Sequence, residues 1–177
     1  GLSWLMAAEL NGWGAPNILN GYERERQPIT EQVSYFVMDH AEAMAGQRGQ
    51  VPDNIEDPGP EGDVVRAIIG KKAYDLNVQQ YCCGGLNYGY FYDNSPIIIR
   101  DGGTPPPYSM AEFTPSTVPG CRTPHYMIGN GRSLYDVMGP EYTLLRTDSE
   151  IYIDSLILAA NEKGVPLCVL DISGEEV

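Results

Sequence analysis

The chain has 177 residues, 42% of them hydrophobic, and it carries 11 basic against 24 acidic residues, a net charge of -13 at pH 7. This length suits one ordinary domain or two small ones. The negative charge argues against nucleic acid and against an anionic membrane surface as partners, because both are negatively charged. No apolar run approaches the roughly 20 residues of a membrane helix. We therefore expect neither a nucleic acid nor a membrane as partner.

Cysteine and histidine positions bear on redox and metal chemistry. The four cysteines include no Cys-x-x-Cys pair, and the adjacent Cys82 and Cys83 are poorly placed for a mutual disulfide. Neither His40 nor His125 has another ligand at metal-binding spacing. We expect reduced thiols packed as small hydrophobic groups, a cytoplasmic protein and no metal site.

The first part of the chain is predicted to be helical. A short helix over Leu2–Leu10 should end at Gly12, and further helices are expected over 16–26 and 28–45. Their junction falls at Gln27–Pro28, because proline suits a first helical turn but removes a backbone bond within a helix. In the third helix, one apolar face is indicated by the spacing of Ile29, Val33, Phe36, Val37, His40 or Ala41, and Met44.

The middle of the chain changes character twice. Residues 46–62 are rich in glycine, proline and acidic residues and are predicted to form a surface loop, followed by a helix over Val64–Val78. From Leu86 to Asp93 the pattern has period two, which predicts a strand, with a second strand over Pro96–Ile99. A row of tyrosines can line an aromatic pocket, although such a row is more often the buried face of a strand.

The last third reads as a mixed helix and strand segment. We predict a strand over Tyr126–Ile128, a turn at Gly129–Gly131 and a short helix over Ser133–Met138. A strand over Tyr142–Arg146, a helix over Ile151–Lys163 and an almost wholly apolar strand over Val165–Leu170 then follow. This order predicts a βαβ unit with a buried parallel strand and a right-handed crossover. His125 reads as a structural residue rather than a base, because no serine or cysteine nucleophile pattern accompanies it.

The N-terminal residues carry a family resemblance. The segment resembles the stretch that follows the second flavin-contacting motif of the FAD-dependent aromatic-ring hydroxylases, roughly "NLxWKLAxxLxGxAxPxLLxSYExERxPxAxxV". Met6 stands where the family often has lysine, and Gly1 where it often has asparagine. The matching positions are Leu2, Trp4, Leu5, Ala7, Leu10, Gly12, Pro16, Leu19, Tyr22, Glu23, Glu25, Arg26, Pro28 and Val33.

Two later stretches resemble the phenol-hydroxylase-like branch of the same family. Leu86, Tyr88, Tyr90, Tyr92, Ser95 and Pro96 match a stretch that leads to the C-terminal domain. The pattern "PGxRxPHxxLxxGxSLYDxxGxxFTLL" followed by "AxxxGVPLxVLDL" is that of the thioredoxin-like C-terminal domain. It matches at Pro119, Gly120, Arg122, Pro124, His125, Gly131, Ser133–Asp136, Gly139, Thr143–Leu145, Gly164–Leu167 and Val169–Asp171. Because that domain has lost the redox cysteine pair, the resemblance implies packing and oligomer contacts rather than thiol chemistry.

The resemblance implies a fold class and a domain organisation. The chain is expected to be an α+β fragment, with helices of the FAD/substrate domain followed by a small thioredoxin-like α/β domain. The implied segments are 1–46, helices after the FAD-binding core; 47–118, an acidic loop, helix and tyrosine-rich connection; and 119–177, the incomplete thioredoxin-like domain. Arg26 would be a structural anchor that braces the FAD domain. The alternative is that the charged run Glu23–Arg26 is a solvated helix face with local ion pairs.

The resemblance also implies a function. The whole enzyme would use FAD and NAD(P)H to hydroxylate a phenolic small molecule with O2, and a homo-oligomer is expected. The sequence contains no Gly-x-Gly-x-x-Gly turn for the FAD pyrophosphate, so this chain by itself should neither bind FAD tightly nor turn over. Gly1 and Leu2 would lie near the flavin, Tyr88 and Tyr90 are substrate-side candidates, and no catalytic residue is assigned. The alternative is a free-standing interaction or dimerisation module without catalytic activity.

Overall fold

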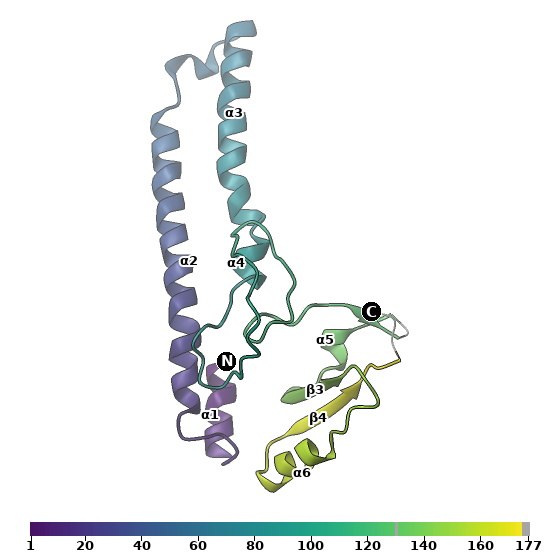
Figure 1. Ribbon diagram of the computed structural model, residues 1–177. Coiled ribbons are helices and arrows are strands. Elements are labelled where there is room, and N and C mark those ends of the chain that lie inside the picture. Colours follow the sequence, from purple (N-terminus) through teal and green to yellow (C-terminus); the bar gives the residue numbers. More distant parts are fainter. Residues whose placement is uncertain (130, 175–177) are drawn as a thin grey trace. The chain divides into compact units, whose positions relative to one another are not determined.

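The computed structural model describes residues 1–129 and 131–174. Five helical elements come first: α1 (Leu2–Leu10), α2 (Ile18–Gly49), the 3-10 turn η1 (Asp53–Glu56), α3 (Pro60–Tyr81) and α4 (Gly84–Tyr88) (Figure 1). They are followed by β1 (Met127–Ile128), β2 (Arg132–Ser133), α5 (Leu134–Val137), β3 (Tyr142–Arg146), α6 (Asp154–Glu162) and β4 (Leu167–Asp171). None of the helices in the described part of the chain is long and apolar enough to cross a membrane.

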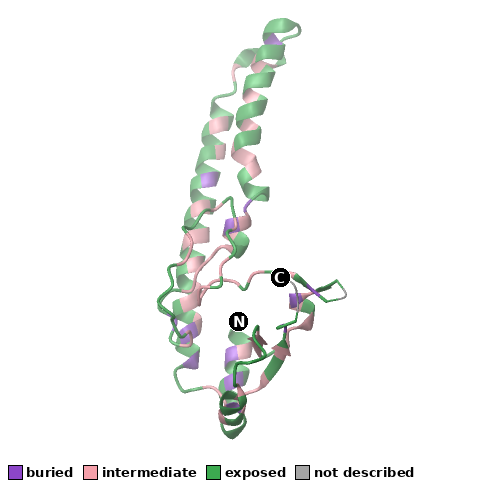
Figure 2. Ribbon diagram, turned by 45° about the vertical axis from the view of Figure 1, so that its right-hand side comes forward, coloured by how far each residue is buried: buried purple, intermediate pink, exposed green. Residues whose placement is uncertain are grey.

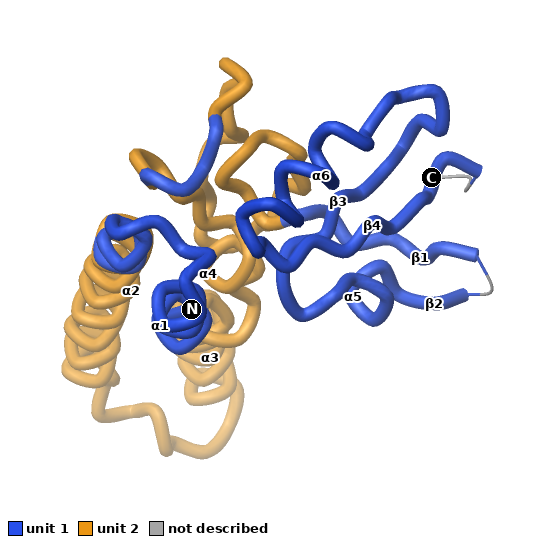
Figure 3. Tube along the Cα trace, turned by 90° about the horizontal axis from the view of Figure 1, so that it is seen from below, with its two compact units in different colours: residues 1–23, 96–99, 123–177 blue, residues 24–95, 100–122 orange. Residues whose placement is uncertain are grey.

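Two compact units divide the chain (Figure 3). Unit 1 contains Gly1–Glu23, Pro96–Ile99 and Thr123–Val177, and unit 2 contains Arg24–Ser95 and Arg100–Arg122. Both units are discontinuous in sequence. The division into segments 1–46, 47–118 and 119–177 stays a prediction.

α2 is a single helix of 32 residues with Pro28 inside it. The prediction of two helices that meet at Gln27–Pro28 is therefore wrong. An internal proline removes one backbone bond and costs about 3 kcal/mol, but the helical turns on either side retain theirs. Around the proline the Thr30 hydroxyl donates to the carbonyl of Arg26 at 2.9 Å, which adds a bond in that turn.

The predicted apolar face of α2 is largely confirmed. His40 is buried, and Ile29, Val33, Phe36 and Met44 are half-buried on the same side of the helix. Val37 is the exception, because 55% of it is exposed (Figure 2 shows the alternation along the helix).

The loop predicted over 46–62 is shorter than expected, because α2 continues to Gly49 and α3 begins at Pro60. Pro60 occupies the first turn of α3, where its missing N–H has no helical acceptor to lose. Val65, Ile69, Ala73 and Leu76 of this helix are half-buried. Val64 and Ile68 belong to a second face that is more than half exposed.

The strand predicted over Leu86–Asp93 is wrong. Residues 84–88 form the short helix α4, and the tyrosines that follow lie in irregular backbone. The amides of Gly84 and Leu86 donate to the carbonyls of Ala111 at 3.1 Å and Met110 at 3.0 Å. Within the predicted strand, the amide of Leu86 thus donates to a loop, and the amides of Asn87 and Gly89 donate to the helical carbonyls of Cys83 at 3.1 Å and Gly85 at 2.7 Å. Pro96–Ile99 forms no strand either, and Ile99 is 90% exposed.

The predicted βαβ unit is confirmed. β3 and β4 pair in parallel, from Tyr142 opposite Leu167 to Arg146 opposite Asp171, and α6 connects them. β4 is not the fully buried strand predicted, because its residues are half-buried or exposed. In the described part of the chain, β3 is its one neighbouring strand. β1 and β2 pair antiparallel through Met127 opposite Ser133 and Ile128 opposite Arg132. Asn130 in the predicted turn between them lies outside the described residues.

The core of unit 1 lies at the corner between α1 and the start of α2. Leu5, Ala8 and Ile18 are buried there, with Trp4, Trp13, Tyr22 and Ile97 packed around them. Trp4 and Trp13 pack edge-to-face with a centroid distance of 5.2 Å, and Tyr142 lies 5.3 Å from Trp4 in the same geometry. Gly12 ends α1 as predicted, with a φ of 78° that favours glycine.

Candidate functional site

The tyrosine-rich segment of unit 2 is held to α2 by Arg26. The Arg26 guanidinium donates to the Tyr92 hydroxyl at 2.8 Å and lies 5.9 Å from the centre of the Tyr90 ring. The rings of Tyr90 and Tyr92 are themselves 5.3 Å apart. Arg26 is therefore an anchor within unit 2, and its predicted role in bracing a FAD domain stays a prediction.

A second polar contact joins the same two segments. Ser95 is only 8% exposed, and its hydroxyl donates to a carboxylate oxygen of Glu25 at 2.6 Å. A hydrogen bond to a charged group contributes about 1.5–3 kcal/mol when it is shielded from water. Glu25 and Arg26, neighbours in the resemblance motif, thus bind the two ends of the Tyr92–Ser95 stretch.

The two substrate-side candidates, Tyr88 and Tyr90, line one small cavity in unit 2. Gly89, Phe91, Pro105, Pro106, Phe113, Thr114, Cys121 and Arg122 complete its wall. The Arg122 guanidinium lies 5.2 Å from the centre of the Tyr88 ring, and Phe113 packs edge-to-face on the same ring at 6.1 Å. The cavity holds about 10 Å³, which is room for roughly one water molecule. An aromatic substrate does not fit it in this structure, and the substrate role of both tyrosines stays a prediction.

Burial raises the pKa of the Tyr92 hydroxyl above its usual value of 10.0, and the nearby Tyr90 adds to this. The hydrogen bond from Arg26 acts in the opposite direction without cancelling it. Tyr92 is therefore a neutral hydrogen-bond acceptor for Arg26 at neutral pH. Its role in this arrangement is to position the segment rather than to transfer a proton.

The flavin-adjacent candidates, Gly1 and Leu2, lie at the start of α1 in unit 1. The Gly1 carbonyl accepts from the amides of Trp4 at 3.1 Å and Leu5 at 3.2 Å. A side chain at Gly1 would lie 3.6 Å from the Tyr22 ring, an ordinary contact distance. Leu2 is 44% exposed. Gly1 and Leu2 thus form the start of α1. That they lie near a flavin stays a prediction.

His125 has a serine neighbour that the sequence reasoning missed. Its Nε2 lies 2.9 Å from the Ser133 hydroxyl, and its ring stacks on Tyr135 with a centroid distance of 5.8 Å. The same Ser133 oxygen accepts from the Tyr135 amide at 3.2 Å and caps α5. An N-cap serine followed by a helix is a recognisable signal, but the sequence pattern does not indicate its pairing with a histidine eight residues earlier. The capping role of Ser133 favours the structural interpretation of His125.

Within residues 1–129 and 131–174, no group of three or more potential ligands could hold a metal ion. The four cysteines are free thiols, with Cys82 and Cys168 exposed and Cys83 buried. The contacts described above consist of hydrogen bonds, ring packing and cation–π pairs, which position backbone segments. The scaffold role predicted for this chain stays a prediction.

No known family model matches the sequence. Individual relatives do, and those relatives are FAD-dependent monooxygenases, so the class predicted from the sequence resemblance is confirmed. The chain is 26% identical to the FAD-dependent monooxygenase opdD of Penicillium oxalicum over 98% of its own length and 34% of that protein. It is also 26% identical to the phenol 2-monooxygenase of a Pseudomonas species, over 94% of this chain and 31% of the relative.

Solved structures agree with this assignment. The rebeccamycin biosynthetic enzyme RebC with reduced flavin matches with a TM-score of 0.81 and 26% identity, covering 97% of this chain and 31% of RebC. The flavin-dependent monooxygenase PieE, in complex with FAD and substrate, matches with a TM-score of 0.71 and 26% identity, covering 96% of this chain and 33% of PieE. The chain thus spans about a third of the length of the relatives it matches.

Proposed function

We propose that this chain is the C-terminal portion of a FAD-dependent monooxygenase that hydroxylates a phenol-type aromatic compound. The observation that carries the proposal is the match to FAD-dependent monooxygenases over 98% of the chain. The phenolic substrate class is supported by the similarity to a phenol 2-monooxygenase. The whole enzyme would take electrons from NADH or NADPH and one oxygen atom from O2, act in the cytoplasm and form a homo-oligomer.

The residues of this chain do not by themselves fit a complete FAD site. The sequence has no glycine-rich dinucleotide turn, and the aromatic cavity described above has room for roughly one water molecule. When bound in the whole enzyme, the reduced flavin would activate O2 for transfer to the aromatic ring. We assign this chain a scaffold role, with Gly1 and Leu2 at the edge of the flavin site. We also assign residues 119–177 to a thioredoxin-like domain without thiol chemistry.

The contacts of two arginines support the proposed scaffold role, because they hold the tyrosine-rich segment in place. Arg26 binds Tyr92, and Arg100 lies 4.4 Å from the centre of the Phe91 ring while it donates to the carbonyls of Tyr92 and Pro119. An irregular segment is thus fixed by charged donors instead of by a sheet ladder. Segments held in this way can present Tyr88 and Tyr90 to a substrate that the rest of the enzyme encloses.

The test is a comparison of the full-length gene product with the 177-residue chain, both purified without added flavin. We expect the full-length protein to be about three times longer, to show the visible spectrum of bound flavin, and to oxidise NAD(P)H faster when a phenol is present. The chain alone should be colourless. Flavin bound to the chain at near one per molecule would contradict the scaffold assignment. If the protein encoded by the natural gene has the same mass as this chain and binds no flavin, the result would instead support the alternative function, a free-standing interaction or dimerisation module.

A further inference from the structure

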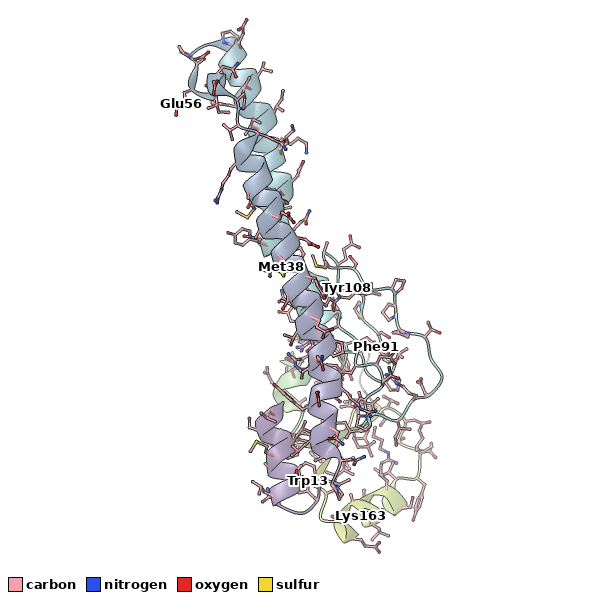
Figure 4. The ribbon with its side chains drawn as sticks, turned by 90° about the vertical axis from the view of Figure 1, so that its left-hand side faces the viewer. Trp13, Met38, Glu56, Phe91, Tyr108 and Lys163 are labelled. Atoms are coloured by element: carbon pink, nitrogen blue, oxygen red, sulfur yellow. The ribbon has the colours of Figure 1, made fainter. Side chains whose placement is uncertain are left out.

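Two distant parts of the chain meet within unit 1 at a pair of tryptophan rings. Trp4 of α1 and Trp13, which follows α1 and is labelled in Figure 4, both pack on the buried core at the corner. The same rings pack edge-to-face on Tyr142, with centroid distances of 5.3 Å from Trp4 and 6.0 Å from Trp13. The indole N–H of Trp4 also donates to the carboxylate of Glu141. The two tryptophans therefore connect the corner core to the start of β3.

Tyr142 lies at one end of the parallel β3–β4 ladder. Its amide donates to the carbonyl of Pro166 at 3.3 Å, next to the first residue of β4. At the other end of the ladder, the Arg146 guanidinium lies 3.4 Å from the Asp171 carboxylate. One end of the strand pair is thus held by an ion pair between the strands, and the other end is held by rings that come from the first 13 residues of the chain.

The C-terminal part of unit 1, residues 123–177, has a small core of its own. In the described part of the chain its buried apolar residues are Ile128, Leu134, Ala160 and Ile172. The residues of β3 and β4 are half-buried or exposed along both strands. Parallel strands are normally covered on both faces, and two strands by themselves are marginally stable in water. The β3–β4 pair therefore depends on the groups that pack against its end.

We propose that α1 and the β3–α6–β4 segment open and close as one cooperative unit, with the contacts of Trp4 to Glu141 and Tyr142 as the clasp between them. Residues 123–177 are then not an autonomous domain, because the ladder opens at Tyr142 when α1 leaves it. The inference goes beyond the proposed function and does not depend on flavin or substrate. Loss of the Trp4 ring contacts and of the indole hydrogen bond together should shift the opening equilibrium about tenfold.

Hydrogen exchange of the 177-residue chain tests the clasp, with mass spectrometry of peptides from α1, from β3 and β4, and from α3. Exchange of protected amides follows the equilibrium of local opening. Trp4→Ala should therefore accelerate exchange in β3 and β4 about tenfold, while α3 of unit 2 keeps its rate. Leu10→Ala is the matched control on the same helix, because Leu10 is 83% exposed, and it should leave the rates in β3 and β4 unchanged.

Milder variants isolate the hydrogen bond and keep the test decisive where Trp4→Ala does not fold. Trp4→Phe keeps an aromatic ring but lacks the indole N–H, and Glu141→Ala removes the acceptor. Glu141→Ala should accelerate exchange in β3 and β4 about two- to threefold, and the double variant should exchange like Trp4→Phe alone, because both changes remove one bond. Glu150→Ala, an equal change of charge at an exposed position of the same unit, should have no effect.

A change made inside the C-terminal part tests the coupling in the opposite direction. Leu134 of α5 is completely buried, so Leu134→Ala weakens this part without altering α1. In one cooperative unit, exchange in α1 should accelerate by the same factor as exchange in β3 and β4. An α1 that keeps its slow exchange in this variant would overturn the proposal, as would Trp4→Phe and Glu141→Ala without effect on the strands. An acceleration that the chain shows and the full-length gene product lacks would overturn it as well.

Discussion

The corner at α1 in unit 1 and the α2–α3 hairpin in unit 2 are both helical, but they bury their apolar side chains to different degrees. In the corner, α1 has only nine residues and still buries Leu5 and Ala8 almost completely. In α3, which has 22 residues, only Gly62 is buried, and the apolar residues Val64 and Ile68 remain exposed.

The difference shows that helix length and burial are separate properties. The corner is closed because Gly14 approaches the backbone of Ala8 and because Trp4 and Trp13 fold over the core. α3 is instead held at its start by Arg66, which donates to the carbonyls of Ile55 and Asp57 and pairs with Asp63 at 2.5 Å. α3 is thus fixed by contacts at its start, whereas α1 is fixed by the side chains that it buries.

The largest change in the free energy of unfolding should come from a substitution in the core at α1. Leu5→Ala removes a side chain that is 3% exposed and should lower the free energy of unfolding by about 2–4 kcal/mol, because a cavity replaces it. Leu10→Ala, a matched change on the same helix at a position 83% exposed, should cost less than about 0.5 kcal/mol. Urea unfolding followed by tryptophan fluorescence measures both, since Trp4 and Trp13 border this core. Equal costs at the two positions would mean that the corner is not the core of unit 1.

A substitution at His40 in α2 should change the free energy of unfolding by a smaller amount, and should raise it rather than lower it. His40 is 6% exposed, and its ring lies 5.8 Å from Phe36. Among residues 1–129 and 131–174, its Nε2 has no hydrogen-bond partner. An unpaired buried polar atom costs about 1–3 kcal/mol, so His40→Leu should raise the free energy of unfolding by roughly 1 kcal/mol. Met38→Leu, at a position that is 65% exposed on the same helix, serves as the neutral control in thermal unfolding. A loss of stability in His40→Leu would show that this imidazole makes a needed contact.

The same comparison explains which parts of the fold could be predicted from the sequence. Helical periodicity and glycine stops identified α1, α3 and α6, and the alternation of helix and strand identified the βαβ unit, because these signals are local. The alternation of residues from Leu86 to Asp93 predicts a strand. The prediction is wrong because such alternation does not indicate whether a partner strand exists. In the structure the amide of Leu86 donates to the loop carbonyl of Met110, and residues 84–88 form α4 instead of a strand.

Pro28 and the candidate site show a second limit of prediction from local sequence patterns. A proline predicts a helix boundary on local grounds, but the turns on both sides of Pro28 keep α2 continuous. The anchor role of Arg26 came from the family motif, whereas its partner Tyr92, 66 residues further along, was visible only in the structure. The pairing of His125 with Ser133, eight residues apart, was likewise visible only in the structure.

The smallest change in the free energy of unfolding should come from loss of the Arg26–Tyr92 contact, and its size should depend on pH. Because burial raises the pKa of Tyr92 in the folded state, the neutral phenol stabilises the fold below its ordinary pKa of 10.0, and this contribution is lost as the pH rises through the folded-state value. Tyr92→Phe removes both the hydrogen bond and this titration. At pH 8 it should be less stable than the original chain by about 0.5–1 kcal/mol, and the gap should narrow toward pH 11.

Urea unfolding at a series of pH values from 8 to 11 measures this gap. Tyr81→Phe provides the matched control, because Tyr81 is 81% exposed and its replacement should leave stability unchanged across the series. A gap for Tyr92→Phe that stays constant or widens with pH would show that ionised Tyr92 is well accommodated beside Arg26. In that case the charge of Arg26 would outweigh burial, and the segment that carries Tyr88 and Tyr90 would be held more strongly at alkaline pH than at neutral pH.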